Sequence, residues 1–231
     1  MVYNNIAYIC QSLNIFVRER KISIKEKINC CIRIWAGASQ GSIVKALYAE
    51  GVKITKQAVS KWMQKWQEVT NWINTVPRRA RKKIAMDEVK IKINGKWAFL
   101  WVAIDVKTRE VIALDVSWLR NGAHAIWCIK DVLKKCKNEK QVVIITDGAG
   151  WYPWACKILH IKHKEVHGGK RNYVERFNLT FKDWVRPFRV NFRVRKGNVL
   201  MKVKQKISAW GGLWYNWNRY HETLGSVPCL S

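Results

Sequence analysis

Acidic residues are scarce in this chain. Its 231 residues include 16 aspartates and glutamates against 43 lysines and arginines, and the formal net charge is +27 at pH 7. That excess is larger than solubility requires and repels itself unless a polyanion lies nearby, so nucleic acid is the expected partner. Because carboxylates are few, each one in an apolar strand becomes a candidate for a functional role. A hydrophobic fraction of 48% predicts a packed core and excludes a disordered basic tail.

The sequence also lacks paired cysteine motifs and long apolar runs. Its seven cysteines include no Cys-x-x-Cys pair and follow no recognisable secretory leader. We therefore expect a reduced intracellular setting and no zinc ribbon or finger. No apolar run reaches the roughly 18 to 20 residues that span a bilayer. No repeat with a period of about 20 to 50 residues is visible, which argues against a solenoid.

Residues 22–70 contain three short amphipathic segments with recognisable starts. Ser23 begins the first segment, with Glu26 three residues later in the capping-box position. Ser39 begins the second segment and Thr55 the third. Three short helices with a glycine-containing turn before the last one predict a helix-turn-helix domain.

The third helix of this domain is expected to run from Lys56 to Trp66. An ordinary three-helix bundle with a solvated lysine face is the alternative interpretation. In a helix-turn-helix domain its polar positions reach phosphates and base edges in a major groove. These positions are Lys56, Gln57, Ser60, Lys61 and Gln64.

Residues 71–83 read as a basic connector between two domains. Pro77 is followed by a run of arginines and lysines, in which Arg78 and Arg79 are candidate phosphate contacts. A flexible tether is the alternative. The separate N-terminal segment, residues 1–21, is expected to contain a short helix that packs on the helical domain after it.

From residue 84 onward, strand patterns begin. Residues 84–93 alternate apolar and basic positions, and residues 96–105 return as a nearly continuous apolar strand. Asn94-Gly95 between them is the strongest short hairpin signal. Residues 109–116 add a third strand, so we expect an antiparallel sheet of three.

Two apolar strands and one helix carry candidate catalytic acids. Asp87 lies in the first strand, and Asp147 ends an apolar run after a helix, where open α/β sheets place ligands. Lys170–Lys182 reads as a helix with Asn172, Glu175 and Lys182 on one stripe. Three carboxylates brought together need a cation to offset their repulsion.

The sequence pattern near the end of the chain allows more than one interpretation. Residues 186–196 interleave arginines with apolar residues, which indicates either a basic-faced strand or a loop along nucleic acid. A final helix from about residue 201 to residue 221 places several tryptophans on one face, where we expect packing rather than base stacking. Arg219 and His221 are expected to support this helix.

The order of these segments resembles the RNase H-like catalytic core of DDE transposases and retroviral-type integrases. The similarity covers most of residues 84–231, and it is that of a bacterial or archaeal insertion-sequence transposase. The spacing of 28 residues between Asp147 and Glu175 is shorter than many members show. The stretches that carry the resemblance are Asp87–Trp97, Trp101–Asp105, Ile145–Gly148, Asn172–Glu175 with Lys182, and Tyr215–Gly225 followed by Pro228.

The resemblance implies an α/β fold, namely an RNase H-like mixed five-stranded sheet flanked by helices in residues 84–231, preceded by the small all-α helix-turn-helix domain. It also implies Mg²⁺ or Mn²⁺ as cofactor, with Asp87 bridging two ions and Asp147 and Glu175 each holding one. Oxygen ligands suit these ions, and an ion pair activates the attacking oxygen and stabilises the leaving one. Lys182, Asn172 and Arg176 would contact DNA near the cut.

The implied reaction hydrolyses an element's end and joins its 3′-hydroxyl to target DNA. The implied partners are double-stranded DNA and further copies of the chain, as a homodimer or larger oligomer, at the nucleoid of a prokaryotic cytoplasm. Two alternatives stay open. A related nuclease would use the same carboxylates without joining strands, and a non-enzymatic helix-turn-helix regulator would explain the charge but not the placement of Asp147 and Glu175.

Other titratable residues are weaker candidates. Glu88 adjoins Asp87 but points to the opposite face of its strand. Asp105 and Asp115 fall near strand ends and are expected at turns or edges. A further set matches no zinc spacing and lies in a basic setting, so surface or DNA-facing roles are expected: Cys156, His160, His163 and His167.

Overall fold

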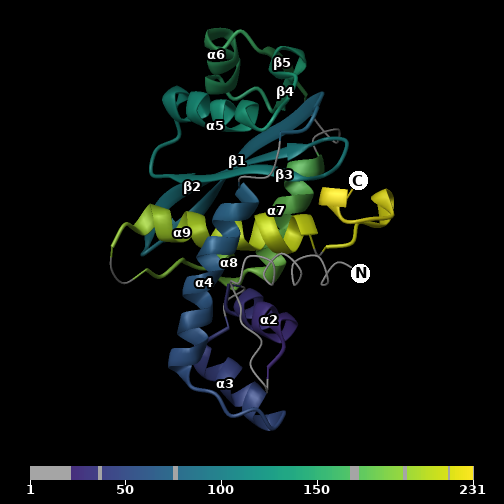
Figure 1. Ribbon diagram of the computed structural model, residues 1–231. Coiled ribbons are helices and arrows are strands. Elements are labelled where there is room, and N and C mark those ends of the chain that lie inside the picture. Colours follow the sequence, from purple (N-terminus) through teal and green to yellow (C-terminus); the bar gives the residue numbers. More distant parts are fainter. Residues whose placement is uncertain are drawn as a thin grey trace.

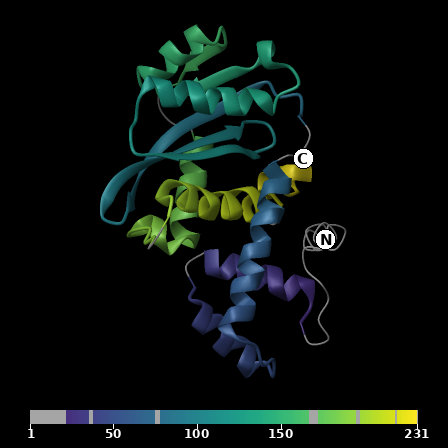
Figure 2. The same ribbon diagram turned by 60° about the vertical axis from the view of Figure 1, so that its left-hand side comes forward.

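The computed structural model describes residues 22–35, 38–74, 78–166, 172–194, 197–217 and 219–230 (Figure 1). The helix expected within residues 1–21 lies outside the described residues. Three helices form one end of the molecule, and a sheet covered by helices forms the other (Figures 1 and 2). No helix in the described part of the chain has both the length and the apolar character needed to cross a membrane.

The helical end consists of α2 (Ile24–Trp35), α3 (Gln40–Ala49) and α4 (Lys56–Asn74). The predicted capping box is present: Ser23 Oγ accepts from the Glu26 N–H at 3.1 Å, and the Glu26 carboxylate accepts from the Ser23 N–H at 2.7 Å. Ser39 and Thr55 cap the next two helices in the predicted way. Helix α4 continues well past the expected end. The three helices enclose a small apolar core of their own.

The sheet has five strands in the order β3-β2-β1-β4-β5. Strands β1, β2 and β3 are antiparallel, whereas β4 runs parallel to β1 and β5 runs parallel to β4. The predicted RNase H-like mixed sheet is therefore confirmed. The residues of the fifth strand, β5, were not located in the sequence, because they are polar. The bounds are β1 (Lys83–Ile93), β2 (Lys96–Asp105), β3 (Val111–Ser117), β4 (Val143–Thr146) and β5 (Lys162–Glu165).

The hairpin between β1 and β2 forms at the predicted turn. Asn94 and Gly95 both have positive φ, at 48° and 82°, as a two-residue type I′ turn requires. The resulting register pairs Ile93 with Lys96. This pairing brings alternate residues of both strands onto the same face.

Helices cover both faces of the sheet (Figure 2). On one face, α5 (Gly122–Lys134) and α6 (Trp151–Ile158) pack on buried residues that include Met86, Trp101 and Ile144. On the other face, α7 (Asn172–Trp184) and α9 (Val199–Ser208) pack on residues that include Ala85 and Val102. The sheet is thus buried on both sides.

The last helix is not a regular α-helix over its whole length. After α9 it continues as the π-helical turn η3 (Ala209–Tyr215), in which Trp210 and Trp214 stack at 4.9 Å and Trp210 contacts Phe177. These contacts confirm that the tryptophans pack. At its end, the Asn216 side chain accepts from the Val111 N–H and donates to the Val111 carbonyl, both at 2.8 Å.

The stretch after α7 does not form the basic-faced strand, one of the two interpretations of residues 186–196; the loop along nucleic acid stays a prediction, and residues 195 and 196 lie outside the described residues. It forms the short helix α8 (Arg186–Arg189) and then a single bridge between Phe192 and Ile93. Pro187 explains the difference, because proline suits the first helical turn and disfavours an added central strand. The other short helical turns are η1 (Glu139–Gln141), η4 (Glu222–Leu224) and η5 (Pro228–Leu230).

The basic connector is docked on the sheet from residue 78, so the flexible-tether alternative is wrong for this part. Arg81 is buried and donates to Asp105 at 3.0 Å and to Glu110 at 2.6 Å. The helical end also contacts the last helix, since buried Ala209 and partly buried Trp217 belong to the apolar core of the three helices. Figure 2 shows α4 passing beside that last helix.

Candidate active site

Two of the three predicted catalytic acids are placed by neighbouring parallel strands, with Asp87 in β1 and Asp147 directly after the end of β4. Ala85 of β1 pairs with Ile145 of β4, and Asp87 and Asp147 each lie two residues later. Because side chains alternate along strands, these two carboxylates stand at the same level of the sheet and on the face of Ala85. That is the face covered by α7, since Ala85 shares a buried cluster with residues of that helix.

Local hydrogen bonds orient both aspartates. Asp87 accepts from the N–H of Glu88 at 2.8 Å, and Asp147 accepts from the N–H of Ala149 at 3.3 Å. Both residues are partly buried.

Glu175 lies in the first turn of the helix that covers this face. Val174 and Phe177 are buried against the sheet, which turns Glu175 outward, where it is exposed. Within the described part of the chain, these three acids do not gather their oxygens within 4.8 Å of one another. The fold thus places two acids together and the third on the adjacent helix, and a shared ion site requires the first turn of α7 to come closer.

Three more predicted residues belong to the same helix. Lys182 is exposed two turns beyond Glu175, roughly 10 Å along the helix axis. Its ammonium lies 6.0 Å from the Phe188 ring centre. Asn172 begins α7, and its side chain lies outside the described residues, whereas Arg176 is exposed next to Glu175.

One carboxylate near Asp147 was not predicted. Gly148 has φ of +87°, and a Cβ placed on it would lie 1.9 Å from Glu165 Oε1. Only glycine allows this approach of Glu165 to the backbone after Asp147. The sequence carried no signal for it, because β5 is polar and short.

Glu88 confirms its predicted orientation. It accepts a hydrogen bond from the Tyr152 hydroxyl at 2.6 Å on the α6 side of the sheet, opposite to α7. Arg120 lies 3.4 Å away and balances its charge. Burial nevertheless raises the pKa of Glu88.

The predicted DNA-facing residues of α4 lie on its outer side. Lys56, Gln57, Lys61 and Gln64 are exposed and Ser60 is partly buried, whereas Val59 and Trp62 face the apolar core of the three helices. This separation of polar and apolar sides fits either a recognition helix or a solvated helix. The DNA contacts of these residues stay predictions.

Arg78 and Arg79 make contacts within the protein. The Arg78 guanidinium donates to the Cys136 carbonyl and to the carboxylate of Glu139, and Arg79 donates to the Cys229 carbonyl at 2.8 Å. These bonds fix the connector to the sheet domain. Their contact with phosphates stays a prediction.

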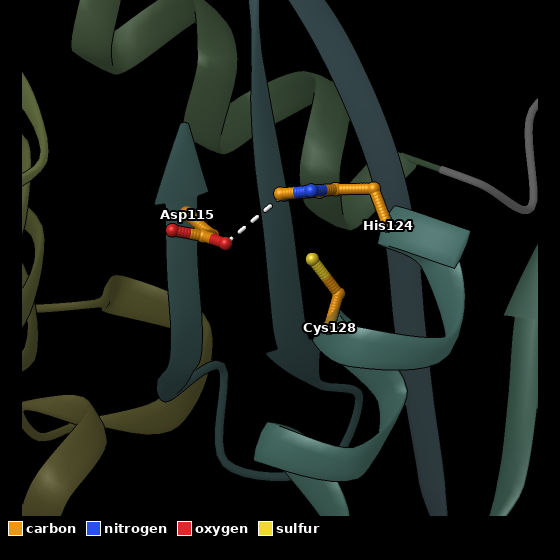
Figure 3. A group of neighbouring side chains, drawn as sticks. All are labelled: Asp115, His124 and Cys128. Carbon is orange, nitrogen blue, oxygen red and sulfur yellow. Dashed lines mark ion pairs between the residues drawn. The ribbon is translucent and has the colours of Figure 1, made fainter. Parts of the chain in front are cut away.

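A separate group of side chains joins β3 and α5 (Figure 3), and Lys204 of α9 approaches it. Ligand-type atoms of Asp115, His124 and Cys128 lie within 4.8 Å of one another. Lys204 approaches Asp115 at 2.7 Å and His124 Nε2 lies 3.0 Å from the other carboxylate oxygen. Burial raises the pKa of the Cys128 thiol, which keeps it protonated. Because Lys204 already balances the carboxylate, we interpret the group as a polar contact between elements.

Comparison with known proteins decides the family. Residues 81–210 match the family model DDE_Tnp_IS240, described as a DDE domain. The chain belongs to the DDE-domain family of insertion-sequence transposases. This DDE-family match spans β1 through the first turn of the C-terminal π-helix, and so contains all three candidate acids.

Several proteins resemble this DDE-family chain in sequence. The uncharacterized protein MJ0017 of Methanocaldococcus jannaschii is 34% identical over 174 residues, which cover 75% of this chain and 78% of that protein. The transposase for insertion sequence element IS257 in transposon Tn4003 of Staphylococcus aureus is 33% identical over 117 residues, or 48% of this chain and 49% of the relative. The chain thus spans about half the length of that transposase.

Solved structures resemble the chain more distantly. The catalytic core domain of HTLV-2 integrase in complex with magnesium has a TM-score of 0.46 and 17% identity, covering 67% of this chain and 97% of that one. The catalytic core domain of BIV integrase has a TM-score of 0.45 and 16% identity, covering 65% and 93%.

Proposed function

We propose that this DDE-family protein is a DNA transposase that cuts the ends of its insertion sequence and joins them to target DNA. The observation that carries the proposal is the placement of Asp87 and Asp147 at one level of neighbouring strands, on the face covered by the helix of Glu175. This placement is an observation on this chain, separate from its membership of the DDE family.

The donor set fits a pair of hard divalent ions. Asp87, Asp147 and Glu175 offer only carboxylate oxygens, which Mg²⁺ and Mn²⁺ prefer. When bound, such ions lower the pKa of the attacking water or hydroxyl and neutralise charge on the leaving oxygen. The chain's own part is to hold two of its carboxylates on rigid strands and to bring the third from α7.

Basic residues around the site would hold the DNA. Lys182 and Arg176 are exposed on the same helix as Glu175, and Asn172 begins that helix. The outer side of α4 would bind the element's ends, with its lysines on phosphates and its glutamines on base edges. A DNA substrate places the protein at the nucleoid in the cytoplasm, and joining two ends requires at least two copies of the chain.

Removal of single carboxylates tests the reaction. We expect Asp87→Asn, Asp147→Asn and Glu175→Gln each to abolish Mg²⁺-dependent cutting of DNA that spans the flanks of the gene, while affinity for that DNA is kept or raised. Asp183→Asn is the matched control, because Asp183 is an exposed acid on the same helix, paired with Arg189. Full activity of the Glu175→Gln variant would remove Glu175 from the site.

The products separate the proposal from its two alternatives. A transposase joins the cut 3′-end to a second DNA, which gel electrophoresis detects as a longer strand. A nuclease of the same fold would give cut ends and no joined product. A non-enzymatic regulator would bind the DNA and give neither product with Mg²⁺ or Mn²⁺.

Substitutions on α4 test the binding of element ends. We expect Gln57→Ala to lower discrimination between an element end and unrelated DNA by about 1 to 3 kcal/mol, because an amide reads base edges. Lys61→Ala should weaken binding to both DNAs alike, because a lysine on phosphate carries no sequence information. Equal behaviour of the two variants would favour the plain helical bundle.

A further inference from the structure

Three arginines from distant parts of the chain line one cavity beside the first turn of α7. Arg109 comes from the turn between β2 and β3, Arg176 from α7, and Arg219 from the segment after the last helix. The cavity has a volume of about 290 Å³. The lining also includes Tyr173, Tyr215 and His221.

Two of these guanidinium groups are held in place by the protein. Arg109 lies 3.8 Å above the ring of Tyr173, and its Nη1 donates to the Val106 carbonyl at 2.6 Å. Arg219 lies over the ring of Tyr215 at 5.0 Å. Stacking on aromatic rings lowers the entropy lost when these groups bind a ligand.

The cavity contains buried polar atoms that lack hydrogen-bond partners. Within the described part of the chain, neither Arg219 Nη1 nor His221 Nε2 has one. A buried donor left without an acceptor costs free energy, so native structures supply the acceptor from protein, water or ligand. Arg219 Nη1 is a donor, so its missing partner is an acceptor, and next to a guanidinium an anionic oxygen is the best one.

The pKa of His221 indicates that the electrostatic potential in the cavity is positive. Burial and, to a smaller extent, the positive charges of Arg219 and Arg109 together lower the pKa of His221 to about 4. Glu222 is the single acid among the described lining residues, and it is exposed. The cavity therefore attracts anions and disfavours cations.

We propose that this cavity binds one backbone phosphate of the DNA substrate, immediately beside the Glu175 site. The inference rests on the proposed function and names a contact of the same substrate. Tyr173 and Arg176 precede and follow Glu175 within about one helical turn, roughly 5 Å of axis. A phosphate in the cavity would thus neighbour the one being cut, and its bidentate contacts with guanidinium groups would fix the strand's position.

A purely supporting role does not account for these features. The backbone N–H of Arg219 donates to the Trp214 carbonyl at 2.9 Å, which suffices to end the last helix. Such a role needs neither the convergence of Arg109 and Arg176 nor two buried atoms without partners. The sequence pattern alone assigned Arg219 and His221 to helix support, because the other two arginines are far away in the chain.

The salt dependence of DNA binding tests the proposal. Affinity of the full chain for a short double-stranded oligonucleotide is measured by fluorescence anisotropy over a range of salt concentrations. Each phosphate contact contributes about 0.9 to the slope of log affinity against log salt. We expect Arg219→Gln to lower the slope by about this amount, and Arg109→Gln with Arg219→Gln to lower it no further, since both arginines serve one phosphate.

Lys130→Gln is the matched control, because Lys130 is exposed on α5, which packs on the face of the sheet opposite to α7. It also removes one positive charge, and we expect it to leave the slope unchanged. An equal fall in the slope for Lys130→Gln would overturn the proposal, as would an unchanged slope for Arg219→Gln. Circular dichroism checks the fold of each variant, and if Arg219→Gln does not fold, Arg109→Gln carries the same test.

The titration of His221, followed by NMR with and without the oligonucleotide, gives a second readout. A phosphate in the cavity stabilises the charged imidazole, so DNA should raise the pKa of His221 from about 4. Inorganic phosphate serves as the comparison, and we expect a smaller rise, because it lacks the rest of the strand. No rise with DNA while DNA still binds would refute the cavity and leave the proposed function intact. Absence of any DNA binding by the unmodified chain would refute both.

Discussion

Arg81 holds the connector on the sheet through buried charge. Its guanidinium bonds to Asp105 and Glu110, and all three side chains are almost fully buried. Removal of the guanidinium leaves two carboxylates buried together without a counter-charge. The free energy lost in this way is far larger than the net stabilisation that the ion pairs provide. We expect Arg81→Met to lower the free energy of unfolding by about 3 to 5 kcal/mol, measured by urea denaturation followed by tryptophan fluorescence.

Arg78→Met is the control for this prediction. Arg78 pairs with Glu139 at the surface, where both side chains are about half exposed. Exposed ion pairs contribute little, so the expected loss is within about 1 kcal/mol. Losses of equal size for the two variants would show that burial of Arg81 is not what stabilises the connector.

The carboxyl group of Asp115 makes the free energy of unfolding depend on pH in the acid range. Burial by itself raises the pKa of this carboxyl, but hydrogen bonds from His124 and Lys204 outweigh it and bring the pKa below its ordinary value of 3.8. A carboxylate whose folded-state pKa is lowered contributes stability above its unfolded-state pKa and loses it as the pH falls through the folded-state value.

We therefore expect Asp115→Asn to destabilise the protein by about 1 to 3 kcal/mol near neutral pH, and the difference to shrink below pH 3.8. Unfolding curves at several pH values measure this. Asp183→Asn, at an exposed acid, should show a small difference throughout. A constant loss for Asp115→Asn across the range would contradict the prediction.

These residues show which contacts the sequence predicts. Ser23 with Glu26 and Asn94 with Gly95 act within a few positions, so their patterns are readable and the structure has both. Asp87 and Asp147 were placed because each lies on a strand whose apolar pattern is visible. Arg81 was read as one member of a basic run, because its partners lie 24 and 29 residues away and only the fold brings them together.

At the scale of elements, two neighbouring glycines in η3 face different surroundings. A Cβ on Gly211 would lie 2.4 Å from Cδ1 of buried Leu114, whereas a Cβ on Gly212 would meet nothing within 4 Å. Gly211→Ala should therefore destabilise the protein by about 1 to 3 kcal/mol through overpacking. Gly212→Ala should stabilise it by about 0.5 to 1 kcal/mol, because alanine suits a helical backbone better than glycine.

Thermal melting of the two variants checks this pair. Leu114→Ala combined with Gly211→Ala should cost less than the sum of the two single losses, since the space opened at Leu114 receives the added methyl group. A rise in melting temperature for both glycine variants would mean that helical propensity alone sets the effect.

Elements differ in how far the sequence predicts them. The strands of the hairpin have a clear apolar pattern, and they formed close to the expected bounds. The stretch around Phe192 alternates as a strand does, but Pro187 starts a helical turn before it and the stretch forms a single backbone bridge. Strand β5 carries no apolar pattern, because it lies at the edge of the sheet.

At the scale of the whole molecule, the helical end and the sheet share a contact at the last helix. Ala209 is buried in the core of the three N-terminal helices, and it belongs to the same helix as Trp210 in the core of the sheet. We expect the unmodified chain to unfold in one calorimetric transition. Ala209→Asp buries an unpaired charge at the contact and should split the transition in two.

Met201→Asp is the control for that substitution, because Met201 is exposed in the first turn of the same helix. A single transition is expected for this variant. Two transitions in the unmodified chain would show that the helical end unfolds on its own. The sequence divided the chain near residue 71, since nothing in it reveals that the last helix touches the first three.

The amide of Asn216 has a consequence for how copies of this chain meet. By bonding to both backbone groups of Val111, it imitates a neighbouring strand at the outer border of the sheet. The backbone of another strand therefore cannot hydrogen-bond to Val111, and edge-to-edge pairing of sheets is blocked at this position. Under the proposed function, contacts between copies of the chain at this position would be made by side chains rather than by backbone hydrogen bonds.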